Sequence, residues 1–99
     1  MKTLDLSETV KNLEGQELKD ENGNALTFGH LLGQTLVTSN GEAGDPIKMF
    51  DWGHALYKTG KVEIDFSDLT TLETFVKNVK TLTILAKGPI LKKISLAKG

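Results

Sequence analysis

The chain has 99 residues, enough for one small domain with a modest core, and 38% of them are hydrophobic and 25% charged, as in ordinary globular proteins. It has no cysteine, which excludes disulfides and thiolate metal sites, and no run of the roughly 20 apolar residues that a membrane-spanning helix needs. The start of the chain carries no signal-peptide pattern, so we expect a cytoplasmic protein without membrane contact.

The net charge of −1 conceals an uneven distribution along the chain. All thirteen acidic residues precede residue 74, whereas residues 74–99 carry six lysines and no acid. Such a tail is either a basic interaction face or a solvated surface whose lysines lie near acids of the same fold. The chain has no arginine, which disfavours sequence-specific nucleic-acid binding but leaves nonspecific phosphate contact through lysine open.

Acidic and amide side chains surround Gly23 in the segment LKDENGNALTFGHLL, as they do in calcium loops. An EF-hand loop that starts at Asp20 needs glycine at its sixth place and glutamate at its twelfth. The chain has Ala25 and Leu31 at these places, so a calcium site is not expected.

A β-hairpin over about residues 13–26 accounts for the same segment, because Asn-Gly is a strong turn signal. A three-residue loop at 21–23 places Leu18 opposite Leu26 and puts its glycine at the left-handed position. No internal repeat is evident along the chain.

Two helices are predicted after this hairpin. The first has Thr27 as its N-cap, carries leucines at helical spacing and ends at the Asn-Gly pair at 40–41, which opens the loop NGEAGD. The second begins at Asp45-Pro46, a cap followed by proline at the first helical position, and ends at Gly60.

The last third of the chain is predicted to hold a strand and further helices. Val, Ile and Phe alternate over residues 62–66, which is typical of a strand with one buried face or of an extended linker. Ser67 or Asp68 then caps a helix. The final segment is apolar on more than one side, and Gly88-Pro89 in its middle predicts either two short helices or one bent helix.

We therefore predict a single domain, residues 1–99, of the α+β class. It is mainly helical, with an N-terminal β-hairpin, about four short helices and one short strand at 62–66.

No arrangement of residues points to catalysis, to a cofactor or to a metal. His30 and His54 lie far apart and have none of the spacings that zinc sites use, and the serines lack the GxSxG pattern of hydrolases. No glycine-rich phosphate loop is present. We expect a protein that is not an enzyme.

The segment MFDWGHALY is the part of the chain most typical of a partner-binding surface. It holds Phe50, the only tryptophan (Trp52) and the only tyrosine (Tyr57), and aromatic residues are enriched at interface hot spots. On a helix, Trp52 lies about 200° from Phe50 and about 140° from Tyr57, so the three cannot all face one core. Either at least one of them reaches a partner, or neighbouring elements cover the helix on both sides.

The alternative site is the basic tail. A weak nucleic-acid binder would use the lysines of that segment, namely Lys77, Lys80, Lys87, Lys92 and Lys93.

Three segments together are similar to small, mostly uncharacterised proteins of tailed bacteriophages and prophages: LEGQELKDENGNALTFGHLL, GDPIKMFDWGHALYKTGKVEIDFSDLTTLETFV and LTILAKGPIL. The resemblance implies a phage or prophage setting rather than an activity, and it supplies no catalytic residues. The leading hypothesis is thus a non-enzymatic protein–protein interaction module that binds a host or phage protein, as an assembly helper or a host-factor modulator. A nucleic-acid binder and a minor virion component are the alternatives, and the C-terminal helix offers a surface for self-association.

Overall fold

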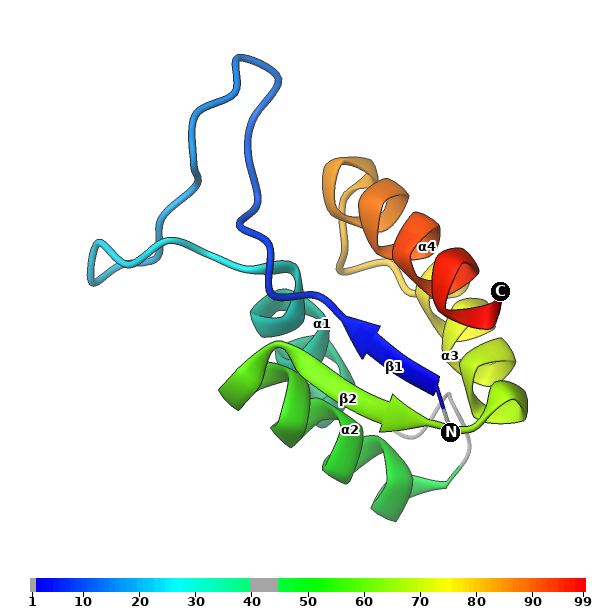
Figure 1. The fold of residues 1–99 in the computed structure, drawn as a ribbon. Coiled ribbons are helices and arrows are strands. Elements are labelled where there is room, and N and C mark those ends of the chain that lie inside the picture. The colour runs from blue at the N-terminus through cyan, green and yellow to red at the C-terminus, as the bar shows by residue number, and fades with distance from the viewer. Residues whose placement is uncertain (1, 40–44) are drawn as a thin grey trace.

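The computed structural model describes residues 2–39 and 45–99 (Figure 1). The predicted helix end at 40–41 and most of the predicted loop after it lie outside these residues. In chain order the elements are β1 (Lys2–Asp5), α1 (Phe28–Thr38), α2 (Pro46–Thr59), β2 (Lys61–Ile64), α3 (Phe66–Asn78) and α4 (Ile84–Lys98).

The molecule is a small, mainly helical α+β domain, as predicted. Its sheet has two antiparallel strands, β1 and β2, paired so that Lys2 faces Ile64 and Asp5 faces Lys61. Figure 1 shows α4 beside β1 and α2 beside β2, so that the helix pairs α1–α2 and α3–α4 flank the sheet. Side chains from all six elements form one apolar core.

The sheet thus differs from the predicted local hairpin, because its two strands come from distant parts of the chain. In the predicted hairpin over residues 13–26 the three-residue turn and the placement of Leu18 opposite Leu26 are confirmed: Lys19 pairs with Ala25, and the N–H of Leu26 donates to the carbonyl of Leu18 at 2.8 Å. Beyond this point the chain does not continue as a ladder.

Residues 10–17 and 18–25 instead form two consecutive loops of the same design. In each, the Oδ1 atom of the third residue, Asn12 or Asp20, accepts hydrogen bonds from the backbone N–H groups two and four residues later, at 2.9 and 3.0 Å. The sixth residue is a glycine with a left-handed φ, 86° in the first loop and 82° in the second. The expectation of no internal repeat is therefore wrong, since aliphatic-Lys-Asn/Asp-x-x-Gly recurs after eight residues.

The bases of the two loops are joined by three aliphatic residues that are also spaced eight apart. The N–H of Val10 donates to Leu26, that of Leu26 to Leu18, and that of Leu18 to Val10, at 2.8, 2.8 and 2.9 Å. These bonds close a ring, and we refer to residues 10–25 as the double loop. In Figure 1 it projects from the body of the molecule.

The predicted starts of α1 and α2 are confirmed. Thr27 Oγ1 accepts from the N–H of His30 at 3.0 Å, and Asp45 Oδ1 accepts from the N–H of Ile47 at 2.9 Å. Gly60, with φ 77°, ends α2 in the left-handed conformation.

The prediction for residues 62–66 is correct only in part. β2 spans Lys61–Ile64, and Phe66 begins α3 with 54% of its surface exposed. The N-cap of α3 is Asp65, not Ser67 or Asp68 as expected. An acidic residue at this place interacts favourably with the positive end of the helix dipole, and the strand ends at Ile64, two residues before its predicted end.

The C-terminal segment forms one helix, α4, with Pro89 inside it, rather than two pieces. Ala86, Ile90 and Ile94 recur every four residues along its buried side, and both isoleucines are fully buried. Their burial outweighs the single hydrogen bond that proline removes.

Candidate functional site

The three aromatic residues of the predicted partner surface are divided between the core and the exterior. Trp52 is buried, with 7% of its surface exposed, whereas Phe50 is 60% and Tyr57 is 49% exposed. Phe50 and Tyr57 are seven residues apart and therefore share one face of α2, while Trp52 turns to the opposite face. The three rings do not face one core, as their helical angles predict, but Trp52 is buried and cannot touch a partner.

The exposed face of α2 carries a continuous row of ring and aliphatic side chains. Ile47, Phe50, His54 and Tyr57 follow one another at intervals of three, four and three residues, and all four are exposed. We call these four residues the α2 patch. Ile47 is 74% exposed, which makes it the most exposed apolar member.

The rings of the patch are stacked against neighbours rather than free in solvent. Phe50 and His54 are parallel within 5°, with ring centroids 6.1 Å apart. His30, which comes from α1, lies 4.2 Å from the ring of Tyr57, at an interplanar angle of 32°. These contacts restrict the side-chain rotamers before any partner binds, which lowers the entropy cost of binding.

Close packing of α1 on α2 determines where the patch lies. A Cβ atom added at Gly33 would be 2.5 Å from the carbonyl oxygen of Gly53, and one added at Gly53 would be 2.6 Å from Val37 Cγ1. Only glycine allows this approach, which brings Val37, itself 47% exposed, to the edge of the patch. The apolar surface therefore extends from α2 onto α1.

Charged side chains of α2 flank the patch, and Asp51 lies beside Ile47 and His54. Asp51 and Lys58 lie on the solvent side of α2, and Lys48 makes a 3.2 Å ion pair with Asp68 of α3. An apolar centre with a charged rim is the usual organisation of a protein-binding surface.

The lysines of the basic tail are partly engaged within the fold. Lys93 Nζ lies 2.7 Å from Glu8 Oε1, and the bond to this carboxylate raises the pKa of Lys93. Lys98 Nζ lies 3.3 Å from Glu73 Oε1. Acids of the same fold thus face part of the tail, as the second interpretation of the charge pattern predicts.

The remaining predicted nucleic-acid contacts come from separate elements. Lys77 lies in the last turn of α3, Lys80 in the connection to α4, and Lys92 on the exposed side of α4. Lys87 Nζ donates to the backbone carbonyl of Lys77 at 3.3 Å, which brings two of these lysines together where α3 meets α4.

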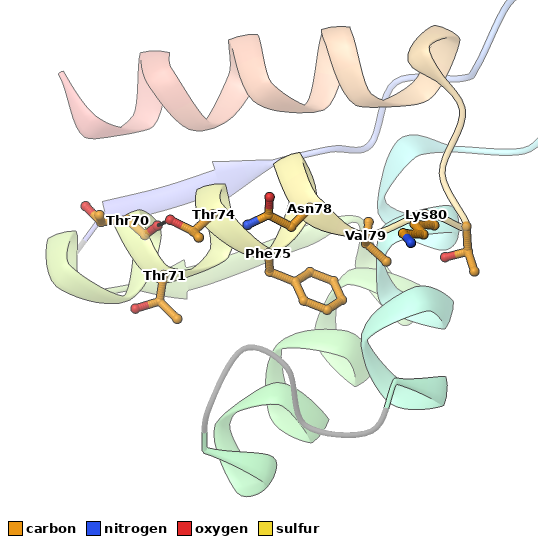
Figure 2. A pocket seen from close by; sticks show the side chains of 8 residues that line it. Thr70, Thr71, Thr74, Phe75, Asn78, Val79 and Lys80 are labelled. Atoms are coloured by element: carbon orange, nitrogen blue, oxygen red, sulfur yellow. Dashed lines mark hydrogen bonds between the residues drawn. The ribbon is translucent and has the colours of Figure 1, made fainter.

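A hollow of about 590 Å³ lies along α3 and is shown in Figure 2. Its wall is rich in threonine, but the hydroxyls of Thr70, Thr71 and Thr74 donate to backbone carbonyls one turn earlier. Phe75, at its base, is a core residue with 5% exposure. The hollow has no titratable side chain other than Lys80 in its described lining, and we assign no chemistry to it.

Metal-binding groups do not assemble in the described part of the chain, where no three His, Asp or Glu side chains lie close enough to hold an ion. The acidic segment around Gly23 is used for folding, since Asp20 accepts the backbone N–H groups of its own loop. Over residues 2–39 and 45–99 no helix has the length and apolarity to cross a bilayer.

Comparisons of the chain with protein-family models, with curated proteins and with solved structures found no match.

Proposed function

We propose that this protein is a small, non-enzymatic protein–protein interaction module of phage or prophage origin. In this proposal it acts in the bacterial cytoplasm, where the α2 patch docks on a host or phage protein. The observation that carries the proposal is the exposure of Ile47, Phe50 and Tyr57 in one row on a helix whose other face is core.

Leaving this apolar surface in water costs free energy. Burial of apolar area contributes about 25 cal/mol per Å², and exposed aromatic residues on a rigid element are typical of binding hot spots. The 3–4–3 spacing suits the apolar face of a helix on the partner, since ridges and grooves of two helices interlock at these intervals. A partner with an amphipathic helix is therefore the best fit, whether the protein assists assembly or modulates a host factor.

The proposal is tested by a pull-down with the tagged protein from bacterial lysate, read by mass spectrometry with and without nuclease. We compare Phe50→Ala with Phe66→Ala, a matched control in which a phenylalanine of similar exposure is removed from α3. Phe50→Ala should lose a partner that Phe66→Ala retains, with both melting temperatures close to that of the parent. Equal recovery by the two variants would contradict docking through the patch.

A second comparison separates binding from folding. Trp52→Ala removes a core side chain and should lower stability by about 3–5 kcal/mol, so any loss of partner would follow from unfolding. If Trp52→Ala leaves the melting temperature unchanged, the division of the aromatic residues between core and surface is wrong.

The same experiment addresses both alternatives. Recovery that disappears with nuclease and falls steeply with salt would favour nucleic-acid binding through the tail lysines. Copurification with intact particles would favour a minor virion component, and concentration-dependent mass in solution would favour self-association through α4.

A further inference from the structure

The extended segment at residues 8–12, which leads into the double loop, presents a free hydrogen-bonding edge. The N–H of Val10 and the carbonyl of Glu8 bond to residues 26 and 28, while the carbonyl of Val10 and the N–H of Asn12 bond to residues 18 and 16. Glu8, Val10 and Asn12 therefore direct their bonded backbone groups to the same side of the segment. Because backbone groups alternate along an extended chain, the N–H and C=O of Thr9 and Lys11 point to the opposite side.

These four backbone groups make no backbone hydrogen bond with any part of the chain that the structure describes. Thr9 is half-buried and Lys11 is exposed, so water can reach the edge. An exposed row of unpaired N–H and C=O groups is a template for pairing with another strand.

The edge borders an open groove of about 490 Å³. On the far side stands the N-terminal half of α4, and Figure 1 shows the double loop and this half of α4 rising next to each other. Phe28, Leu85 and Pro89 supply apolar wall, while Glu8, Thr9 and Lys11 supply the polar side. A strand edge opposite a helix, with apolar side chains between them, is the arrangement of proteins that bind peptides by strand addition.

Pro89 leaves a backbone carbonyl of α4 without its helical donor on the groove wall. Pro89 has no N–H, so the carbonyl of Leu85, one turn earlier, lacks the donor that it would have in a regular helix. Both residues line the groove and are half-buried.

We propose that this groove binds an extended segment of another protein, which adds as a strand to the edge formed by Thr9 and Lys11. Free donors and acceptors that recur every second residue match an extended backbone and not a helix. The segment would place alternate apolar side chains against Phe28, Leu85 and Pro89.

The charges favour an acidic segment. Glu8 is already paired with Lys93 at 2.7 Å, whereas Lys11 has no ion pair within the described residues. The charge at the groove that has no ion pair among the described residues is thus that of Lys11, and an acidic side chain of the ligand would complement it. The groove and the α2 patch share no residue, so a peptide would bind here whether or not the patch binds a protein.

The test titrates the full chain, labelled with ¹⁵N, with a short synthetic peptide of alternating valine and glutamate at millimolar concentration. We expect the amide signals of Thr9 and Lys11 to shift and their hydrogen exchange to slow, while those of Phe50 and Tyr57 stay unchanged. Two modified peptides sharpen the result: one is N-methylated at every valine and the other at every glutamate. Since strand addition uses one edge of the peptide, one of them should bind about tenfold more weakly and the other as the parent.

The repeat supplies a matched control on the protein. Lys19 occupies in the second loop the place of Lys11 in the first, and its N–H likewise makes no backbone hydrogen bond in the described structure, but Lys19 does not line the groove. Lys11→Pro should lose the peptide, and Lys19→Pro should keep it. If a proline variant does not fold, Lys11→Glu against Lys19→Glu replaces the pair: only the former should come to prefer a valine–lysine peptide over the valine–glutamate peptide.

Several outcomes would overturn the proposal. They are unchanged Thr9 and Lys11 signals, equal binding of the parent and both methylated peptides, and equal loss in the Lys11 and Lys19 variants. Shifts of the same amides with protein concentration alone would assign the groove to a second copy of this chain.

Discussion

The double loop and the α1–α2 pair are specified by different physics. In the double loop, side-chain oxygens accept backbone N–H groups within the same loop, and Leu13 at one tip is 96% exposed. In the helix pair, Leu32 and Leu56 are fully buried and the backbones meet at glycine. Local hydrogen bonds thus define the double loop beyond its aliphatic base, where Val10 and Leu18 reach the core, while the helices depend on apolar contacts between distant residues.

The helix pair should be the more sensitive of the two regions to an added methyl group. In Gly33→Ala the new Cβ would lie 2.5 Å from the carbonyl oxygen of Gly53 and 2.9 Å from the backbone nitrogen of Tyr57, neither of which can turn away. We expect a loss of about 3 kcal/mol in the free energy of unfolding, measured by urea denaturation. The row of rings on α2 should also shift, since Tyr57 packs where the methyl would go.

Gly88→Ala in α4 is the control for this change. A Cβ at Gly88 meets no atom within 4 Å. The gain in helix propensity opposes the restriction imposed by the following proline, so the net change should stay within about 1 kcal/mol. Equal losses in the two variants would mean that helix conformation, and not the contact between α1 and α2, limits stability.

The double loop should respond to loss of a single acceptor. In Asp20→Ala two backbone N–H groups lose their partner at once, and we expect a loss of about 1–2 kcal/mol, smaller than that of Gly33→Ala because water replaces the acceptor. Asp20→Asn should be nearly neutral, since Asn12 plays the same part in the first loop with an amide oxygen. Hydrogen exchange of the amides of Asn22 and Asn24 reports the effect directly.

The outcome that would contradict this view of the double loop is specific. If Asp20→Asn is as destabilising as Asp20→Ala, the carboxylate charge matters rather than the acceptor geometry, and the two loops are not physically equivalent.

The same contrast explains which parts of the fold could be predicted from the sequence. Thr27, Asp45-Pro46 and Gly60 were assigned correctly because caps act within one turn of their own residue. The pairing of β1 with β2 could not be predicted, because it joins segments from distant parts of the chain and depends on the helices between them. The repeat is faint in the sequence because only two of its eight positions, a lysine and a glycine, are identical, although the recurring Lys-Asn/Asp-x-x-Gly is a visible signal.

The surface residues show the same difference between what local sequence predicts and what depends on contacts between distant residues. Helical angles separated Trp52 from Phe50 and Tyr57 but could not say which side is core, since this depends on where α1 and the sheet pack. The contact of His30 with Tyr57 could not be predicted, because it joins two helices. The free edge at Thr9 and Lys11 depends on the register of the double loop, which appears only when the backbone hydrogen bonds are known.

The smallest expected effect on stability concerns a turn just before the double loop, in which a side-chain oxygen again accepts a backbone N–H group two residues later. Asp5 Oδ1 accepts from the hydroxyl of Ser7 at 2.6 Å and from its backbone N–H at 3.0 Å. The hydroxyl bond first, and then the backbone bond, lower the pKa of Asp5 below its ordinary value of 3.8. The folded state therefore binds the proton more weakly than the unfolded state, so this contribution to stability is complete above that value and is lost as the pH falls through the lowered pKa.

Ser7→Ala should flatten the acid side of the stability profile, measured as melting temperature between about pH 5 and pH 2. The effect should be small, because Asp5 is exposed and solvent screens its interactions. Ser67→Ala, which changes an exposed serine of α3, is the control and should leave the profile unchanged. If Ser7→Ala and the parent lose stability in parallel as the pH falls, the turn at Asp5 does not contribute to acid sensitivity. Side-chain acceptors would then define the shape of the segment leading into the double loop without adding to its stability, which would widen the difference from the helix pair.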